Sequence, residues 1–458
     1  MNITMQEPNL IDGFNEEDIF NRKKLFQQIV RLIQHSPDNS LVFALDDKWG
    51  NGKTTFVKML HSEISKSEDY EIDALYFDSF ENDYQNDPFI SISSLLYSYI
   101  SSKKSIKKNV GDKILTGMRK VGASLFLNGS KLAITSISAG LVSGTKLDEI
   151  GGVISDSLKE EVEGFIENRI KSSNEEKANI ESFKDSLKQI NKDSNRKTLV
   201  IIDELDRARP DYALDLLERI KHLFSVDGLI FLLVMNREQF EKSISCRYGD
   251  IDARLYLNKF IHYWFTLPKK NAHSMHVAVG ESPTTIYDYI TYIIEKNKIN
   301  TISRNGTFVK TLSFLIEKNK GSLRETERCL SVLAVIDNPD ELAKTTSNYY
   351  NASLALIVFL KVFNPNLLDE LISKRIERKN FIQEIKIFPL TIKNNIISKA
   401  NYDILDSLIK YHYLTDEELR NERGQVNSWA HEIDSYASGS RARFFEVIAQ
   451  SLEYMHIN

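Results

Sequence analysis

The chain has 458 residues, of which 42% are hydrophobic and 27% charged, with only 9 prolines and 19 glycines. This length suggests two or three domains, and the composition excludes a disordered or collagen-like chain because ample apolar surface offsets the entropy lost on folding. The 59 basic and 64 acidic residues give a net charge of -5, so charge alone does not support nucleic-acid binding.

Five short apolar segments rich in β-branched and aromatic residues predict buried β-strands. In chain order they are residues 40–45, 72–77, 198–202, 229–235 and 262–267. Amphipathic stretches between them, such as 22–33 and 212–224, predict helices, and Pro210 suits the first turn of the second. This alternation is typical of an α/β fold with a doubly wound parallel sheet.

The spacing of these segments divides the chain into parts. Residues 1–78 and 198–268 are expected to form the α/β core. Residues 79–197 separate the second and third strands by far more than a crossover needs, so they predict a mostly helical insertion. After Pro268 the strand signals fade, and we expect a helical, lid-like subdomain over 269–340 and a C-terminal helical domain over 341–458.

A glycine-containing loop, DDKWGNGKTT over residues 46–55, stands between the first predicted strand and a predicted helix. Glycines let backbone N–H groups converge on an anion, and a helix N-terminus favours negative charge. Lys53 would reach the β- and γ-phosphates of a nucleotide, and the Thr54 hydroxyl would ligate Mg²⁺. We expect the nucleotide to contact Trp49, Gly50, Asn51, Gly52, Lys53, Thr54 and Thr55.

A second motif follows the third predicted strand, where an apolar run ends in Asp203-Glu204-Leu205-Asp206. Two carboxylates at the end of a buried strand are typical of a site that holds Mg²⁺ and activates water for phosphoryl transfer. We expect Asp203 to hold the metal together with Thr54, and Glu204 to act as the base. Asp206 is the alternative base.

Three further polar residues are candidates for the same chemistry. Asn236 follows the fourth strand and would sense the γ-phosphate or position water, the alternative being a helix N-cap. Arg254 precedes the fifth strand and would serve the γ-phosphate of a neighbouring subunit, the alternative being a surface ion pair. Arg324 opens a helix in the 269–340 segment and would lean over the nucleotide, the alternative being a structural ion pair.

Together these segments resemble the KAP family of P-loop NTPases. The resemblance covers about residues 15–335 and rests on KWGNGKT at 48–54, FDSFEND at 77–83, IDELDRARP at 202–210, NREQ at 236–239 and GSLRETER at 321–328. It implies an ASCE-type core with strand order 5-1-4-3-2, ATP as the nucleotide, and a long insertion that often carries membrane-spanning helices. The chain departs from the family pattern at Asp47, which replaces a glycine, at Glu204, which replaces an aspartate, and at Asn236, where many members have aspartate.

The predicted function is therefore Mg²⁺-dependent hydrolysis of ATP that drives a conformational or assembly switch. By resemblance alone, the setting is bacterial antiphage defence, with a homo-oligomer and a partner protein of a defence system. The alternatives are a nucleotide-dependent scaffold or sensor that hydrolyses ATP slowly or not at all, and a membrane-associated ATPase that organises protein complexes.

Several features bear on location and partners. Two cysteines, Cys246 and Cys329, suit a reducing compartment, and residues 1–20 contain no apolar run, so we expect a cytoplasmic protein. Residues 121–145 carry a single charge, Lys131, but their many small residues and that central lysine predict a soluble helical hairpin, with membrane contact as the alternative. The basic segment 371–400 leaves nucleic-acid binding open as a minor alternative.

A metal site at the histidine pair His273 and His276 is not expected, because no cysteine partner stands nearby.

Overall fold

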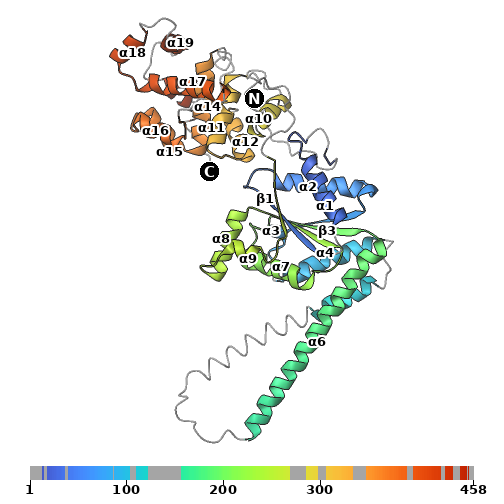
Figure 1. Ribbon diagram of the computed structural model, residues 1–458. Helices are drawn as coiled ribbons and strands as arrows, with labels where there is room; N and C mark the ends of the chain where they lie inside the picture. The colour runs from blue at the N-terminus through green and yellow to red at the C-terminus, as the bar shows by residue number, and fades with distance from the viewer. Residues whose placement is uncertain are drawn as a thin grey trace, which may run out of the picture.

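The computed structural model describes residues 13–14, 18–36, 40–85, 87–103, 110–121, 156–268, 285–297, 306–333, 347–388, 396–423, 429–436, 444–450 and 452. In Figure 1 a long helical projection lies at the bottom, a sheet-containing part lies in the middle, and an all-helical part lies at the top.

A five-stranded parallel sheet forms the centre of the first part, in the order β2-β3-β4-β1-β5. The strands are β1 (Leu41–Asp46), β2 (Ile72–Asp78), β3 (Lys197–Asp203), β4 (Leu229–Met235) and β5 (Tyr263–Thr266). Read from the other edge, this is the order 5-1-4-3-2 that the family resemblance implies. The predicted α/β fold is confirmed.

Helices cover both faces of the sheet. On one face, α1 (Lys23–His35) and α2 (Lys53–Lys66) pack on Phe43 and Leu45, while Val42 and Ala44 of the same strand face the other layer. That other layer contains α4 (Pro88–Ser102), α7 (Pro210–Leu223), α8 (Arg237–Tyr248) and α9 (Ala253–Leu257). Every residue of the central strand β4 is buried, as expected for a strand covered on both faces.

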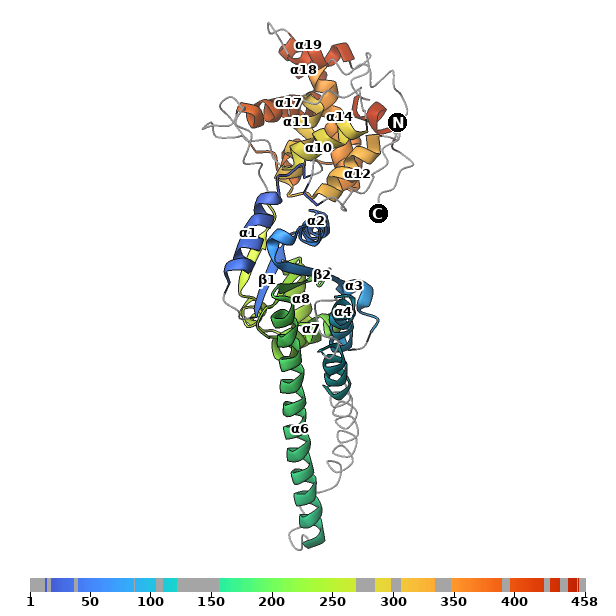
Figure 2. The same ribbon diagram turned by 90° about the vertical axis from the view of Figure 1, so that its right-hand side faces the viewer.

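The insertion between β2 and β3 is helical where the structure describes it. It begins with α3 (Ser79–Asn82) and α4, continues through helical residues 110–121, and ends in α6 (Asp156–Ser194). At 39 residues, α6 is about 58 Å long, and it projects away from the sheet (Figure 2). The hairpin predicted for 121–145 lies, from residue 122 onward, outside the described residues.

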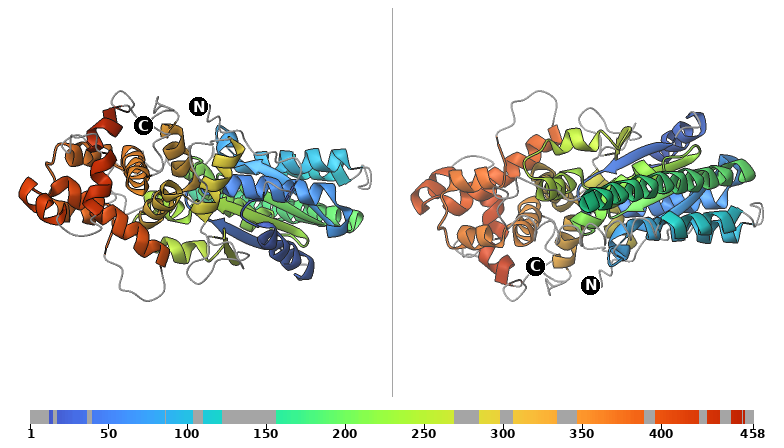
Figure 3. Two further views of the ribbon diagram at one scale, coloured as in Figure 1. Left: turned by 90° about the horizontal axis from the view of Figure 1, so that it is seen from above. Right: turned by 90° about the horizontal axis from the view of Figure 1, so that it is seen from below.

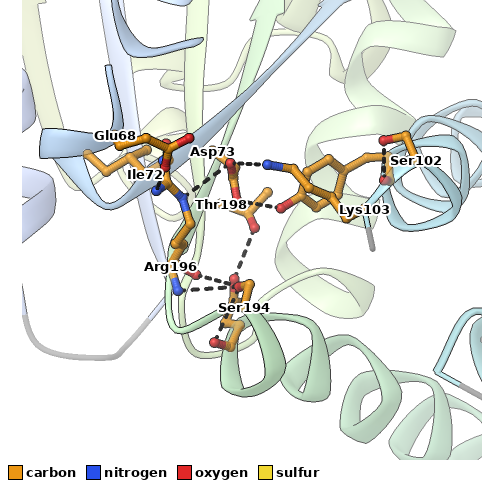
Figure 4. A network of polar contacts seen from close by, with 10 residues as sticks. Glu68, Ile72, Asp73, Ser102, Lys103, Ser194, Arg196 and Thr198 are labelled. Carbon is orange, nitrogen blue, oxygen red and sulfur yellow. Dashed lines mark hydrogen bonds and ion pairs between the residues drawn. The ribbon is translucent and has the colours of Figure 1, made fainter. Parts of the chain in front are cut away.

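Both ends of the insertion are tied to the start of β2 by a polar network (Figure 4). Asp73 of β2 accepts a hydrogen bond from the Tyr99 hydroxyl (2.6 Å) and forms an ion pair with Lys103 (2.8 Å), both from the α4 end. Arg196, which follows α6, also pairs with Asp73 (3.3 Å) and donates to the carbonyl of Ile72 (2.9 Å). The projection is therefore anchored at the edge of the sheet remote from the loop after β1.

The all-helical part lies at the end of the sheet that carries this loop, where the backbone N–H of Arg324 meets the carbonyl of Gly50. Figure 3 shows the same part from above and below. Its helices are α10 (Thr285–Lys296), α11 (Thr307–Lys318), α12 (Leu323–Leu333), α14 (Asn348–Phe363), α15 (Pro365–Ile372), α16 (Arg378–Glu384), α17 (Ile396–Tyr413), α18 (Asp416–Arg423), α19 (Trp429–Tyr436) and α20 (Phe444–Gln450). The helix α14 is buried on all sides from Tyr350 to Leu360. The apolar side chains from Ile286 to Leu452 form one cluster, so the two helical segments expected at 269–340 and 341–458 share a single core.

None of the described helices is both long enough and apolar enough to cross a membrane.

Candidate functional site

The loop between β1 and α2 has the backbone conformation that its glycines predict. Gly50 (φ 80°) and Gly52 (φ 79°) both lie in the left-handed region, where residues with a side chain are strained. Gly52 immediately precedes α2, so the loop delivers its backbone to the positive end of that helix. The loop is thus built as a cradle for an anion.

Lys53 is held against the loop. Its ammonium group donates hydrogen bonds to the carbonyls of Asp47 (2.7 Å) and Lys48 (3.2 Å). Burial lowers the pKa of Lys53, whereas the carboxylates of Asp206 and Asp47 act in the opposite direction. The cation therefore stands inside the cradle, within reach of any phosphate that enters it.

Asp47 stands where P-loops usually have glycine, and the structure accommodates it without backbone strain, since its φ is not positive. Its carboxylate accepts hydrogen bonds from the backbone N–H of Lys48 (2.7 Å) and the side-chain amide of Asn51 (2.5 Å). The side chain is only 7% exposed. Through these two hydrogen bonds, the Asp47 carboxylate stabilises the conformation of the loop.

The turn after β3 meets the loop directly. The Thr54 hydroxyl donates a hydrogen bond to Oε1 of Glu204 (3.0 Å), and Nε of Arg207 pairs with Oε2 of the same carboxylate (2.6 Å). A second link joins the two segments, because the indole N–H of Trp49 donates to Oδ2 of Asp206 (2.5 Å). The two motifs predicted from the sequence are therefore in contact.

Asp203 is buried at the end of β3, with 1% of its surface exposed. It accepts hydrogen bonds from the backbone N–H of Glu204 (2.8 Å) and the hydroxyl of Tyr76 in β2 (2.9 Å). Burial raises the pKa of Asp203 to about 6, although these hydrogen bonds and the Thr54 hydroxyl favour the charged form.

A buried arginine supports the loop from outside the two motifs. Arg22 donates hydrogen bonds from Nη1 to the carbonyl of Gly52 (3.2 Å) and from Nη2 to that of Asn51 (2.9 Å). Its guanidinium lies 4.5 Å from the centre of the Phe20 ring, and burial lowers its pKa to about 10. Sequence reasoning missed Arg22 because it sits at the start of an ordinary amphipathic segment, and its partners are thirty positions away.

A cavity of about 460 Å³ lies over the loop, a size suited to a small-molecule ligand. Its wall joins the loop and the β3 turn to α10, α12 and the segment before α1. Its lining includes Phe20, Arg22, Gly50, Lys53, Thr54, Glu204, Arg207, Tyr289, Tyr292 and Arg324. The cavity combines cations and backbone N–H groups, which suit phosphates, with aromatic rings, which suit the base of a nucleotide.

The pattern of the KAP family P-loop domain matches residues 22–339. The chain belongs to the KAP family. This membership, together with the P-loop fold, supports nucleotide binding as the role of the cavity. A comparison with the curated proteins finds no match.

Among solved structures, the chain is similar to the ORC2 protein of Aeropyrum pernix in ADPNP–ADP complexes, with 12% identity, a TM-score of 0.34, and 89% of this chain and 90% of that chain covered. It is also similar to Cdc6p of Pyrobaculum aerophilum, with 11% identity, a TM-score of 0.36, and coverage of 94% and 90%.

The other predicted residues of this KAP chain fall in three places. Arg324 lines the cavity at the start of α12, and its backbone N–H donates to the carbonyl of Gly50 (3.2 Å). Asn236 lines an adjoining cavity of about 630 Å³ with Asp46 and Asp47. Among the described residues, the Asn236 side chain makes no capping hydrogen bond at the start of α8, so the N-cap alternative is not observed.

Arg254 is exposed on α9 and lines a shallow groove with Glu238 and Lys242. Within the described part of the chain, the structure therefore does not bring Arg254 to the cavity of its own subunit. It leaves the side chain open to a neighbouring molecule.

The residues assigned to Mg²⁺ suit that ion. Mg²⁺ prefers oxygen ligands and takes several of them from water and phosphates, so it needs one or two protein groups only. The Thr54 hydroxyl and the Asp203 carboxylate are such groups, and they lie close enough to interact. In the described residues, no cluster of three or more His, Cys, Asp or Glu side chains is placed to hold a metal. The pair His273 and His276 lies outside them.

Proposed function

We propose that this KAP protein binds ATP with Mg²⁺ in the cavity over the loop and hydrolyses it to drive a conformational or assembly switch. The observation that carries the proposal is the hydrogen bond of 3.0 Å between Thr54 and Glu204. This hydrogen bond shows that two groups lie together beside the loop. One is a hydroxyl suited to hold the metal, and the other is a carboxylate suited to activate water.

The chain's own residues have distinct roles in this reaction. The loop N–H groups and Lys53 hold the phosphates, and Thr54 and Asp203 hold the metal. Glu204 accepts the proton of the water that attacks the γ-phosphorus, as the bond to the ADP oxygen breaks. Bound Mg²⁺ supplies positive charge to the phosphates. Arg324, which faces the same cavity from α12, offsets the charge of the transferred group.

Contact between the loop and the helical part supports a switch. The backbone N–H of Arg324 donates to the carbonyl of Gly50, so α12 is attached to the loop that would hold the phosphates. A change in the conformation of the loop on binding or hydrolysis of ATP would displace α12. It would then reach the core that α12 shares with α14.

The biological setting rests on the KAP family resemblance: bacterial antiphage defence, with a homo-oligomer and a defence partner. The exposure of Arg254 on α9 suits action on a second copy of the chain.

One observation favours a slow-turnover sensor as the second candidate. Oε1 of Glu204, the oxygen that Arg207 does not hold, accepts a hydrogen bond from Thr54, so this hydrogen bond must open before Oε1 can act as the base.

Measuring ATP binding and phosphate release in parallel tests the proposal. Glu204→Gln should bind MgATP with wild-type affinity, because Thr54 and Asp203 remain, but should lose about 10²–10⁴-fold in turnover, the usual contribution of a general base. Glu417→Gln, the same change at an exposed position of α18, should do neither. Wild-type turnover in Glu204→Gln would assign the base to Asp206 or another group. A wild-type protein that binds ATP without releasing phosphate would favour the sensor.

A further inference from the structure

The carboxylate of Glu204 has two partners of different kinds. Oε1 accepts a hydrogen bond from the Thr54 hydroxyl (3.0 Å), and Oε2 is paired with Nε of Arg207 (2.6 Å). Thr54 stands at the position from which P-loops ligate Mg²⁺, so metal binding would draw its hydroxyl away from Oε1. Arg207 cannot ligate a metal, so its hold on Oε2 would persist.

The backbone conformation of the turn after β3 holds Arg207 beside Glu204. Glu204 has a φ of 54°, an uncommon conformation for a residue with a long side chain. The backbone N–H of Arg207 donates to the carbonyl of Glu204 (3.1 Å), which closes a turn, and the N–H of Leu205 donates to Val234 of β4 (3.3 Å). A strained residue held by its surroundings at a candidate site indicates a functional constraint.

Burial increases the strength of this ion pair. The side chains of Arg207 and Glu204 are 32% and 18% exposed, and both line the cavity. An ion pair that is partly shielded from water keeps its geometry better than one on the open surface.

We propose that Arg207 is the positioning residue of the reaction. It fixes Oε2 of Glu204, so that when Thr54 turns to the metal, Oε1 is the free oxygen that faces the attacking water and accepts its proton. This inference rests on the proposed hydrolysis of ATP, because it assigns a role to a residue that acts through Glu204. Arg207 itself forms and breaks no bond.

Single-turnover hydrolysis and ATP affinity of Arg207→Ala test this role. ATP affinity should stay within about twofold of wild type, while the rate should fall about 10–100-fold, as expected when a catalytic group loses its orientation. Arg207→Lys should recover part of the loss, because an ammonium can still pair with Oε2. Arg247→Ala, which removes another arginine–carboxylate pair, between α8 and Asp211 of α7, is the matched control and should be neutral. Thermal unfolding of each variant shows whether it is folded; if Arg207→Ala is not, the lysine variant and the combination below carry the test.

The combination of Arg207→Lys with Glu204→Gln separates positioning from direct contact with phosphate. If Arg207 acts only through Glu204, the double variant should be no slower than Glu204→Gln alone, because the group being positioned is already lost. Further slowing in the double variant, or an unchanged rate in Arg207→Ala, would overturn the proposal. Failure of the proposed function is recognised separately, because wild-type protein would then release no phosphate in the same assay, and the role of Arg207 would fall with it.

Discussion

Gly50 is the residue at which the phosphate-binding loop touches the helical part of the protein. Its φ of 80° suits only glycine, and a Cβ there would stand 2.7 Å from the Cβ of Arg324. Gly50→Ala should therefore lower both the free energy of unfolding, by about 1–2 kcal/mol from the backbone alone, and the affinity for ATP. Denaturant unfolding and calorimetric titration measure the two effects.

Gly249→Ala is the matched control for this prediction. Gly249 has nearly the same φ, 78°, but a Cβ there meets nothing within 4 Å. Its ψ of -152° places it in a region that is essentially confined to glycine, so Gly249→Ala should lose at least as much stability and leave ATP affinity unchanged. Equal effects of the two variants on ATP affinity would show that contact between the loop and α12 does not matter for binding.

At the scale of residues, the sequence predicts those parts of the site that follow a local pattern. Lys53, Thr54, Asp203 and Glu204 lie within two short motifs, each attached to a buried strand, and the structure brings them together. Arg22 could not be predicted, because its role depends on carbonyls of a loop that only the folded chain places beside it.

At the scale of elements, the anchoring of the insertion depends on one buried acid. Asp73 binds Tyr99, Lys103 and Arg196, and its side chain is 10% exposed. Asp73→Asn should lower the free energy of unfolding by about 1.5–3 kcal/mol, the usual contribution of hydrogen bonds to a charged group, because Lys103 and Nε of Arg196 lose the charge that they pair with, although Arg196 keeps its pair with Glu68. ATP affinity should be retained, since the network lies at the opposite end of β2 and β3 from the site.

The control for this prediction is Asp185→Asn on α6, where an acid that is 70% exposed pairs with Lys188. It should change the free energy of unfolding by less than about 1 kcal/mol, as is usual for surface pairs. Chemical denaturation of both variants provides the comparison, and a similar small effect of the two would contradict the anchoring role of Asp73.

The sheet could be predicted almost completely, because buried parallel strands are continuous apolar runs that stand out from amphipathic helices. The predicted segment 40–45 is shifted by one residue from β1, and the segment 72–77 ends one residue before β2. The direction of α6 could not be predicted, because a helical pattern specifies a helix and not where it points. The shared core around α14 was missed for a related reason: a helix buried on all sides lacks the periodicity that assigns it a neighbour.

At the scale of the whole molecule, Arg254 is the residue that would require a second copy of the chain. It is exposed on α9 and lines a groove separate from the loop cavity. If it acts on a neighbour's γ-phosphate, Arg254→Ala should lower turnover by about 10³-fold or more and leave ATP binding unchanged. A mixture with Glu204→Gln should recover part of the activity, because some interfaces would contain one intact site. No recovery in assemblies shown to be mixed would reduce Arg254 to a surface residue.

Calorimetric titration of MgATP into wild type, Lys53→Ala and Lys24→Ala tests whether the cavity over the loop binds the phosphates of ATP. Lys24 is exposed on α1 and serves as the matched control. Loss of a charge-assisted hydrogen bond to phosphate costs about 1.5–3 kcal/mol, so Lys53→Ala should bind about 10–100-fold more weakly than wild type, while Lys24→Ala should bind as tightly. Unchanged affinity in Lys53→Ala, or no binding by wild type, would show that this cavity does not bind the phosphates of ATP.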